Sequence, residues 1–423
     1  MTPTEQRSSR FVSLITRDTL ALVLAGGRGT RLGALTRHRV KPAVPFGGKY
    51  RLVDFPLSNC INSGIRRIGV LTQYKSHSLI RHLQQGWGFL KGEFGEFIDI
   101  LPAQQRTGEH WYLGTADAIY QNLDIIRAHD PQFVIILGGD HVYKMDYGAL
   151  LAYHLESHAD VTVACMQVPL SQASAFGIMT IEDNGRIREF AEKPANPAPM
   201  PGVPDCALAS MGIYVFNTEY LIETLSTDAK QTSSSHDFGK DIVPQAVANA
   251  ATFAFPFRND LTGELAYWRD VGNLDSYWAS NLELIGARPE LNLYDAEWPI
   301  WTLHDTFPPA KFAIDAEGHA GVAEDSLVAS GCIIVGAVVK HSVLFPNVRA
   351  EPGAEIDECV IFHDAMVGAG CKLRRVVVDS RCVIPPGTVI GYNRTDDEQR
   401  FEVSAGGVVL VTPEMLGQRI RHV

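Results

Sequence analysis

Runs of aliphatic residues alternate with amphipathic stretches over about the first two thirds of the chain. Three runs, 20–25, 67–72 and 133–138, are mostly apolar, which is typical of parallel strands that are covered on both faces. The stretch 115–129 has one apolar side and predicts a helix. Strands and helices in alternation predict an α/β domain.

Three later runs, 161–168, 177–181 and 209–216, predict further strands, some of them antiparallel, so a mixed sheet is expected. Near residue 298 the pattern changes. The segment "WPIWTLHDTFPPAKF" mixes polarities and contains two adjacent prolines, which indicates a linker packed on a domain surface. We therefore expect a first domain over 18–295, a linker over 296–320 and a second domain over 321–423.

Beyond the linker, aliphatic residues recur at every sixth position. The series are Val328 and Ile334; Ile361, Val367 and Leu373; and Val377, Val383 and Val389. Glycine, asparagine and proline fall between them, and the phase is lost over 340–358. A hexad repeat with turn residues predicts a parallel β-helix, whereas an irregular sandwich would alternate without a period of six.

Composition narrows the class of protein. The 423 residues favour two domains, and 46% hydrophobic with 20% charged residues describes an ordinary globular chain. A net charge of −11 argues against nucleic acid or an anionic membrane as a partner. We expect no signal peptide and no membrane span. Seven cysteines without a C-x-x-C pair argue against a zinc site and against a disulfide framework, and they favour a reducing cytoplasm.

The segment "LVLAGGRGTRLGALT" (22–36) runs from a predicted strand into glycine. Gly26, Gly27 and Gly29 would let backbone N–H groups approach a phosphate closely. The spacing matches neither the dinucleotide-binding fingerprint nor the Walker A loop. Taken alone, the segment could equally be a tight turn with solvated arginines.

Cationic residues close to this loop favour the phosphate interpretation. Lys41 precedes Pro42, so we expect it to be extended and to reach back toward the loop. Together with Arg31, it could neutralise a leaving pyrophosphate.

The glycine segment is the first of eight motifs that occur in the order of a known family. The others are "GIRRIGVLTQYKSHSLIRHL", "WYLGTADAIYQNLDII", "GGDHVYKMDY", "REFAEKP", "ASMGIYVF", "SSSHDFGKDIVP" and "YWRDVGNLDSYWASN". The chain resembles the sugar-1-phosphate nucleotidylyltransferases and, more narrowly, the bacterial ADP-glucose pyrophosphorylases. The resemblance implies a Rossmann-like catalytic domain followed by a left-handed β-helix. It also implies that ATP and glucose 1-phosphate give ADP-glucose, for glycogen synthesis, and diphosphate.

The resemblance also implies roles for individual residues. Asp140 and Asp270 match the family's pair of Mg²⁺ ligands, and carboxylates with substrate phosphates suit that ion. The glycines would hold ATP, and Arg31 and Lys41 would be catalytic. Lys193 matches the lysine that binds the phosphate of glucose 1-phosphate. The sugar would be held by Tyr112, Gly177, Glu192 and Ser210. Gln104 and Gln105 could bind the adenine edge or could equally be a pair of surface glutamines.

Family members are regulated by a sugar-phosphate activator and by AMP, ADP or phosphate, at a site between the two domains, and a homotetramer is expected. Glycogen-making members often carry a lysine where this chain has His38. Arg39 and Arg51 keep positive charge at that site, and a C-terminal arginine is displaced to Arg381.

Three other functions stay open at this point. UDP- or dTDP-glucose pyrophosphorylases share the chemistry, although "SHDFGKDIVP" and the short hexad region favour ADP-glucose. An acyltransferase would share the hexads, but about 100 residues is short for one. A catalytically silent regulatory subunit would share the fold, but it would not need the retained charged residues.

Overall fold

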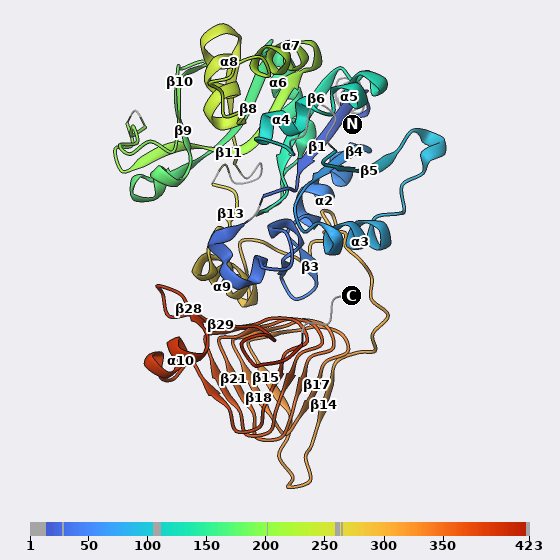
Figure 1. Cartoon of the computed structure of the whole chain (residues 1–423), viewed down its shortest axis with the longest axis vertical. Coiled ribbons are helices and arrows are strands. Elements are labelled where there is room, and N and C mark those ends of the chain that lie inside the picture. Colours follow the sequence, from blue (N-terminus) through green and yellow to red (C-terminus); the bar gives the residue numbers. More distant parts are fainter. Residues whose placement is uncertain are drawn as a thin grey trace.

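The computed structural model describes residues 14–27, 29–104, 111–200, 202–258, 263 and 265–419. An α/β domain occupies one end of the molecule and a stack of short strands occupies the other (Figure 1). The expected α/β domain and parallel β-helix are both confirmed.

The sheet of the α/β domain is built around strand β1 (Thr19–Leu24). It lies parallel between β4 (Arg67–Thr72) and β6 (Phe133–Gly138), and β11 (Cys206–Asn217) runs antiparallel to β6. The sheet is therefore mixed, as predicted. Its remaining strands are β5 (Phe97–Pro102), β8 (Val161–Pro169), β9 (Gly177–Ile181), β10 (Ile187–Glu192) and β12 (Thr252–Pro256).

Both faces of this sheet are covered. Along β1, Ala21 and Val23 enter one hydrophobic core, whereas Leu20 and Leu22 enter another. A strand buried on both faces reads as a continuous apolar run, which explains why its pattern is recognisable in the sequence. The helices are α2 (Asp54–Asn62), α3 (His77–Gly86), α4 (Thr115–Tyr120), α5 (Leu123–His129), α6 (Tyr147–Glu156), α7 (Thr218–Asp228), α8 (Val243–Asn249) and α9 (Leu274–Leu282).

The single helix predicted over 115–129 is wrong, because the segment forms two helices, α4 and α5. The break lies at Asn122, whose φ of −114° is not helical. Its side-chain amide donates to the carbonyl of Ala118 at 2.8 Å and to the Tyr112 hydroxyl at 2.9 Å. Asparagine side chains compete with helical backbone hydrogen bonds in this way.

The β-helix has three sheets in which successive coils pair in parallel, and the third sheet ends in one antiparallel strand. The first holds β14 (Lys311–Ala313), β17 (Ile333–Val335), β20 (Arg349–Ala350), β23 (Met366–Val367) and β26 (Val383–Ile384). The second holds β15 (Val322–Glu324), β18 (Val338–Lys340), β21 (Glu355–Asp357), β24 (Lys372–Arg374) and β27 (Val389–Ile390). The third holds β16 (Leu327–Val328), β19 (Val343–Leu344), β22 (Val360–Ile361), β25 (Val376–Val378), β29 (Val409–Val411) and β28 (Glu402–Val403). A short helix, α10 (Arg394–Arg400), precedes β28.

The structure confirms the six-residue repeat, but the inward-facing residues of the last series lie one position later than predicted. Val383 and Val389 are 42% and 44% exposed, whereas Ile384 and Ile390 are fully buried in the core of the coils. From β17 to β26, successive strands of the first sheet lie 16, 17 and 17 residues apart, not 18. One side of each of these coils is therefore shorter than six residues, which explains the loss of phase over 340–358.

The two domains share a hydrophobic core. Leu32, Phe46 and Tyr277 of the α/β domain pack in one cluster with Phe362 and Leu410 of the β-helix. Because interdomain surfaces of this apolar character resemble a protein interior, we treat the two domains as one packed unit. We call this cluster the shared core.

The segment between the domains lies against α2. Trp301 donates its backbone N–H to Ser58 Oγ at 2.8 Å, and Thr302 donates its hydroxyl to the buried Asp54 at 2.7 Å. The same carboxylate accepts from His82 Nε2 at 2.6 Å and from Trp87 Nε1 at 3.0 Å. This segment is therefore anchored by directed hydrogen bonds as well as by apolar contacts.

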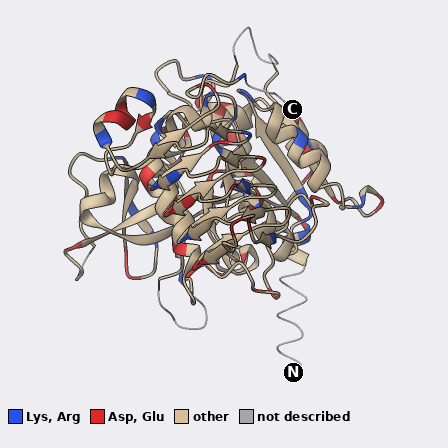
Figure 2. Cartoon of the chain, turned by 90° about the horizontal axis from the view of Figure 1, so that it is seen from below, with Lys and Arg blue, Asp and Glu red and all other residues tan. Residues whose placement is uncertain are grey.

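Charges of both signs are interspersed over the coils when the molecule is seen from the β-helix end (Figure 2). Among the described residues, no helix has both the length and the apolar character needed to cross a bilayer.

Candidate active site

The glycine loop leaves β1 at the carboxyl edge of the sheet, where open α/β sheets bind ligands. Gly29 has φ +60°, and a Cβ placed on it would lie 2.8 Å from Lys41 Cβ. Glycine is therefore needed there for both backbone conformation and space. A Cβ on Gly27 would meet nothing within 4 Å among the described atoms, which leaves that peptide accessible to a ligand.

Lys41 lies beside the loop, but the reason given for its position is wrong. It is the first residue of the 3-10 helix η2 (Lys41–Ala43), and Val40 is the extended residue before it. The N–H of Val44 donates to the Lys41 carbonyl at 3.0 Å, which stabilises this turn despite the following proline. The Lys41 ammonium is buried and reaches two carboxylates.

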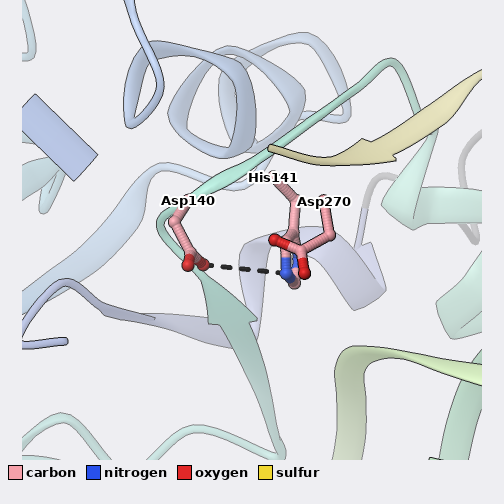
Figure 3. Close-up of side chains that lie close together, drawn as sticks. All are labelled: Asp140, His141 and Asp270. Atoms are coloured by element: carbon pink, nitrogen blue, oxygen red, sulfur yellow. Dashed lines mark ion pairs between the residues drawn. The ribbon is translucent and has the colours of Figure 1, made fainter. Parts of the chain in front are cut away.

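Those carboxylates are Asp140 and Asp270, which lie 130 residues apart in the sequence. The β7 strand (His141–Tyr143) pairs antiparallel with β13 (Trp268–Asp270), with His141 opposite Asp270. This short ribbon brings the side chains of Asp140, His141 and Asp270 together (Figure 3). Lys41 Nζ lies 2.9 Å from Asp140 Oδ2 and 2.8 Å from Asp270 Oδ1.

The charges in this cluster stabilise one another. Burial by itself would lower the pKa of Lys41, but Asp140 and Asp270 outweigh it and raise the pKa. Burial would raise the pKa of Asp140, but Lys41 and His141 lower it to about 2. Both groups are therefore ionised at neutral pH.

The cluster also fits a divalent cation. Ligand atoms of Asp140, His141 and Asp270 lie within 4.8 Å of one another. The second oxygen of Asp140 lies 3.7 Å from His141 Nε2, and that of Asp270 lies 4.0 Å from Arg31 Nη2. Lys41 therefore engages one oxygen of each carboxylate and leaves the other for a metal, and carboxylate oxygens suit Mg²⁺. Arg31, with its side chain 66% exposed, belongs to the same group.

The predicted sugar-binding residues form a second group around the β9–β10 pair. Gly177 is paired with Glu192, and a Cβ on Gly177 would lie 2.4 Å from the Phe190 ring. This glycine is thus required by neighbouring side chains even without a ligand. Glu192 Oε1 lies 2.6 Å from the Nζ of Lys193, whose side chain is 57% exposed. The ammonium is accessible at the edge of this group.

Ser210 and Tyr112 lie on neighbouring elements. Ser210, on β11, is buried, and its Oγ accepts from the N–H of Gly212 at 3.2 Å. Burial, together with the carboxylates of Glu192 and Asp237, raises the pKa of Tyr214, while Ser210 has the opposite effect. The Tyr112 hydroxyl accepts from the side-chain amide of Asn122 at 2.9 Å, and the Tyr112 ring packs against the same core cluster as Phe190.

The two glutamines are only partly covered by the structure. Gln104 is exposed and follows β5, which lies parallel to β4, so it lies at the same sheet edge as the glycine loop. Gln105 lies outside the described residues.

Two of the predicted effector residues, His38 and Arg39, contact the β-helix, whereas Arg51 contacts α3 of the α/β domain. Arg39 Nη2 forms an ion pair with Asp379 Oδ1 at 2.8 Å, while the buried Arg39 Nη1 donates to no acceptor among the described residues. His38 Nε2 lies 2.8 Å from Glu414 Oε1. Arg51 donates to the Ser78 carbonyl at 2.8 Å, and burial lowers its pKa to about 10.

Arg381 is separate from these pairs, with its Nε 3.5 Å from Asp364 Oδ2.

Sequence reasoning missed some neighbours of the predicted residues. His141 stands within the quoted motif "GGDH", so its adjacency to Asp140 could have identified it. The partners Asp379 and Glu414 are separated from Arg39 and His38 by more than 300 residues and lie outside the quoted motifs.

Two family models match this chain. One, described as "Nucleotidyl transferase", covers residues 20–285, and the other, described as "GlmU-like, C-terminal hexapeptide", covers 308–411. The second agrees with the left-handed β-helix that was expected.

Curated relatives match the chain over nearly all of its length. The glucose-1-phosphate adenylyltransferase of Methylococcus capsulatus is 62% identical over 413 residues, which are 98% of this chain and 97% of the relative. The glucose-1-phosphate adenylyltransferase 2 of Alkalilimnicola ehrlichii is 59% identical over 416 residues, 98% of each chain. That of Nitrosococcus oceani is 57% identical over 421 residues, 99% of this chain and 100% of the relative.

Proposed function

The chain belongs to the nucleotidyl transferase family, as a full-length relative of glucose-1-phosphate adenylyltransferases, and we propose that it transfers the adenylyl group of ATP to glucose 1-phosphate. The products are ADP-glucose, a glucosyl donor for glycogen synthesis, and diphosphate. The observation that carries this proposal is the convergence of Asp140, Asp270 and Lys41 beside the glycine loop.

The reaction needs positioning and charge neutralisation more than covalent chemistry by the protein. A phosphate oxygen of glucose 1-phosphate forms a bond to the α-phosphorus of ATP, while the bond from that phosphorus to the diphosphate oxygen breaks. The backbone of the glycine loop would hold the triphosphate. Arg31 and Lys41 would compensate the charge that develops on the leaving diphosphate.

We propose Mg²⁺ as the metal, with Asp140 and Asp270 as its protein ligands. When bound, it would supply charge neutralisation for the phosphates. Lys41 Nζ contacts both carboxylates and so keeps them close together, where a cation could bind between them.

Initial rates with ATP, UTP and dTTP test the nucleotide, with diphosphate release as the readout. A clear preference for ATP supports the proposal. Preference for UTP or dTTP would assign the chain to a different sugar-nucleotide synthesis, and no release with any nucleotide would indicate a silent subunit.

Lys193→Ala is expected to raise the KM for glucose 1-phosphate about 10- to 100-fold, while the KM for ATP changes little. A lysine–phosphate contact that is equal in ground and transition states contributes to binding without changing kcat. Steady-state kinetics with each substrate varied in turn will measure this, with the exposed Lys230→Ala as the control. A collapse of kcat at unchanged KM would instead assign Lys193 to the chemical step.

We further propose that a sugar-phosphate activator and an adenine-nucleotide or phosphate inhibitor bind near His38, Arg39 and Arg51. The buried, unpaired Arg39 Nη1 supports an anion there. We also propose a homotetramer that acts in the cytoplasm, where the seven free cysteines would stay reduced.

His38→Lys is expected to lower the half-saturating concentration of a sugar-phosphate activator several-fold. A lysine ammonium is a compact cation with three N–H donors for a phosphate. Glu414 pairs with both His38 and Arg37, so its carboxylate competes with the activator for this site. The measurement is an activator titration of wild type and variant under the same conditions. Equal half-saturating concentrations would exclude a role for this position.

A further inference from the structure

The hairpin formed by β28 and β29 (402–411) ends the third sheet of the coils and faces the α/β domain beside α9 (Figure 1). It contacts two segments that carry proposed active-site residues. One is the 3-10 helix η1 (Thr30–Thr36), which begins directly after Gly29 and contains Arg31. The other is the first turn of α9, which follows Asp270 closely.

The first contact is made by Glu402. Its Oε2 accepts the backbone N–H of Ala34 at 3.0 Å. This bond lies at a kink, because Gly33 interrupts η1 with φ +58° and ψ −136°. A Cβ on Gly33 would lie 1.8 Å from Glu402 Oε1, so the carboxylate occupies the space that only a glycine leaves open.

The second contact is made by the turn of the hairpin. Asp275, in the first turn of α9, accepts the hydroxyl of Ser404 and the N–H of Gly406, the latter at 3.1 Å. A Cβ on Gly406 would lie 2.5 Å from Asp275 Oδ1. Between Asp275 and Asp270, the Gly272 N–H donates to the Asp270 carbonyl at 2.8 Å, so the connection is a tight turn.

We infer that this hairpin is a positioning element for the adenylyl transfer, with Glu402 holding the kinked helix that presents Arg31 and the glycine loop to ATP. The inference rests on the proposed function for its kinetic part. Displacement of a substrate-positioning segment by about 1 Å can change rates by up to 10²-fold, so a contact from the second domain can matter.

Glu402→Ala is expected to raise the KM for ATP about 10-fold, to leave the KM for glucose 1-phosphate within about twofold, and to speed hydrogen exchange over 30–36. Glu402→Gln keeps an acceptor oxygen and should restore most of the ATP affinity. Glu398→Ala is the matched control, because Glu398 pairs with Arg394 inside α10. This control should change neither the KM values nor the hydrogen exchange over 30–36.

Gly406→Ala tests the second contact, because the added methyl must displace Asp275. We expect a lower kcat with little change in either KM. If Glu402→Ala raised both KM values by the same factor and also lowered the thermal stability, Glu402 would only hold the two domains together, and the inference would be overturned. Unchanged exchange over 30–36 would overturn it as well. If the wild type transfers no adenylyl group, the proposed function fails, while hydrogen exchange still decides whether Glu402 holds the kink.

Discussion

Asp140→Asn is expected to lower kcat at least about 100-fold at saturating ATP, glucose 1-phosphate and Mg²⁺. The amide keeps the shape of the side chain but removes the charge that would hold a metal, and this charge matters most when the transition state forms. It also leaves the Lys41 ammonium with one carboxylate instead of two. The measurement is initial rates over a range of Mg²⁺ concentrations.

Asp183→Asn, in an exposed turn, is the control for the loss of a carboxylate elsewhere. Circular dichroism should confirm that Asp140→Asn is folded. Turnover close to that of the wild type at high Mg²⁺ would remove Asp140 from the catalytic assignment.

Asp54→Ala is expected to reduce the free energy of unfolding by about 3–5 kcal/mol. The fully buried carboxylate accepts from His82, Trp87, Thr302 and the N–H of Arg51. Its removal leaves these donors buried without a partner and releases the segment between the domains. Urea unfolding followed by tryptophan fluorescence will measure the loss, and the exposed Asp99→Ala should lie within about 0.5 kcal/mol of the wild type.

The effect of Asp54 on stability should depend on pH with a defined sign. Burial would raise the pKa of Asp54, but His82 and the other hydrogen bonds lower it below its usual value. A carboxyl whose pKa is lowered on folding contributes its full stabilisation above the pKa that it has in the unfolded chain, about 3.9. This stabilisation is lost as the pH falls through the pKa of the folded state. The gap between wild type and Asp54→Ala should therefore be constant from pH 8 to 5 and narrow below about pH 4. A gap that widens in acid would contradict this assignment.

The strands that carry the active site could be predicted because they are covered on both faces. Burial makes 20–25 and 133–138 continuously apolar, and a period of six is visible wherever coils repeat. The last hexad series was misplaced because Val383 and Ile384 are both aliphatic. Hydrophobicity alone does not show which of two adjacent aliphatic residues faces inward.

The grouping of the site was harder to predict because it depends on tertiary pairing. The sequence identified Asp140 and Asp270 through motifs, but only the β7–β13 ribbon shows why they meet. Asn122 broke a predicted helix through a bond to Tyr112. Partners such as Glu402 stand in segments with no local signal, since an exposed glutamate on a short strand has the same sequence pattern with or without a contact.

The shared core makes the order of synthesis important. A ribosome completes Leu32, Phe46 and Tyr277 well before it reaches Phe362 and Leu410, which cover them. At about 5–20 residues per second, the remaining stretch of chain takes on the order of ten seconds to appear. During that interval the α/β domain carries an open apolar surface on one side. Chaperones that bind such surfaces would therefore first contact the side of the α/β domain that later forms the shared core, before the last coil has been made.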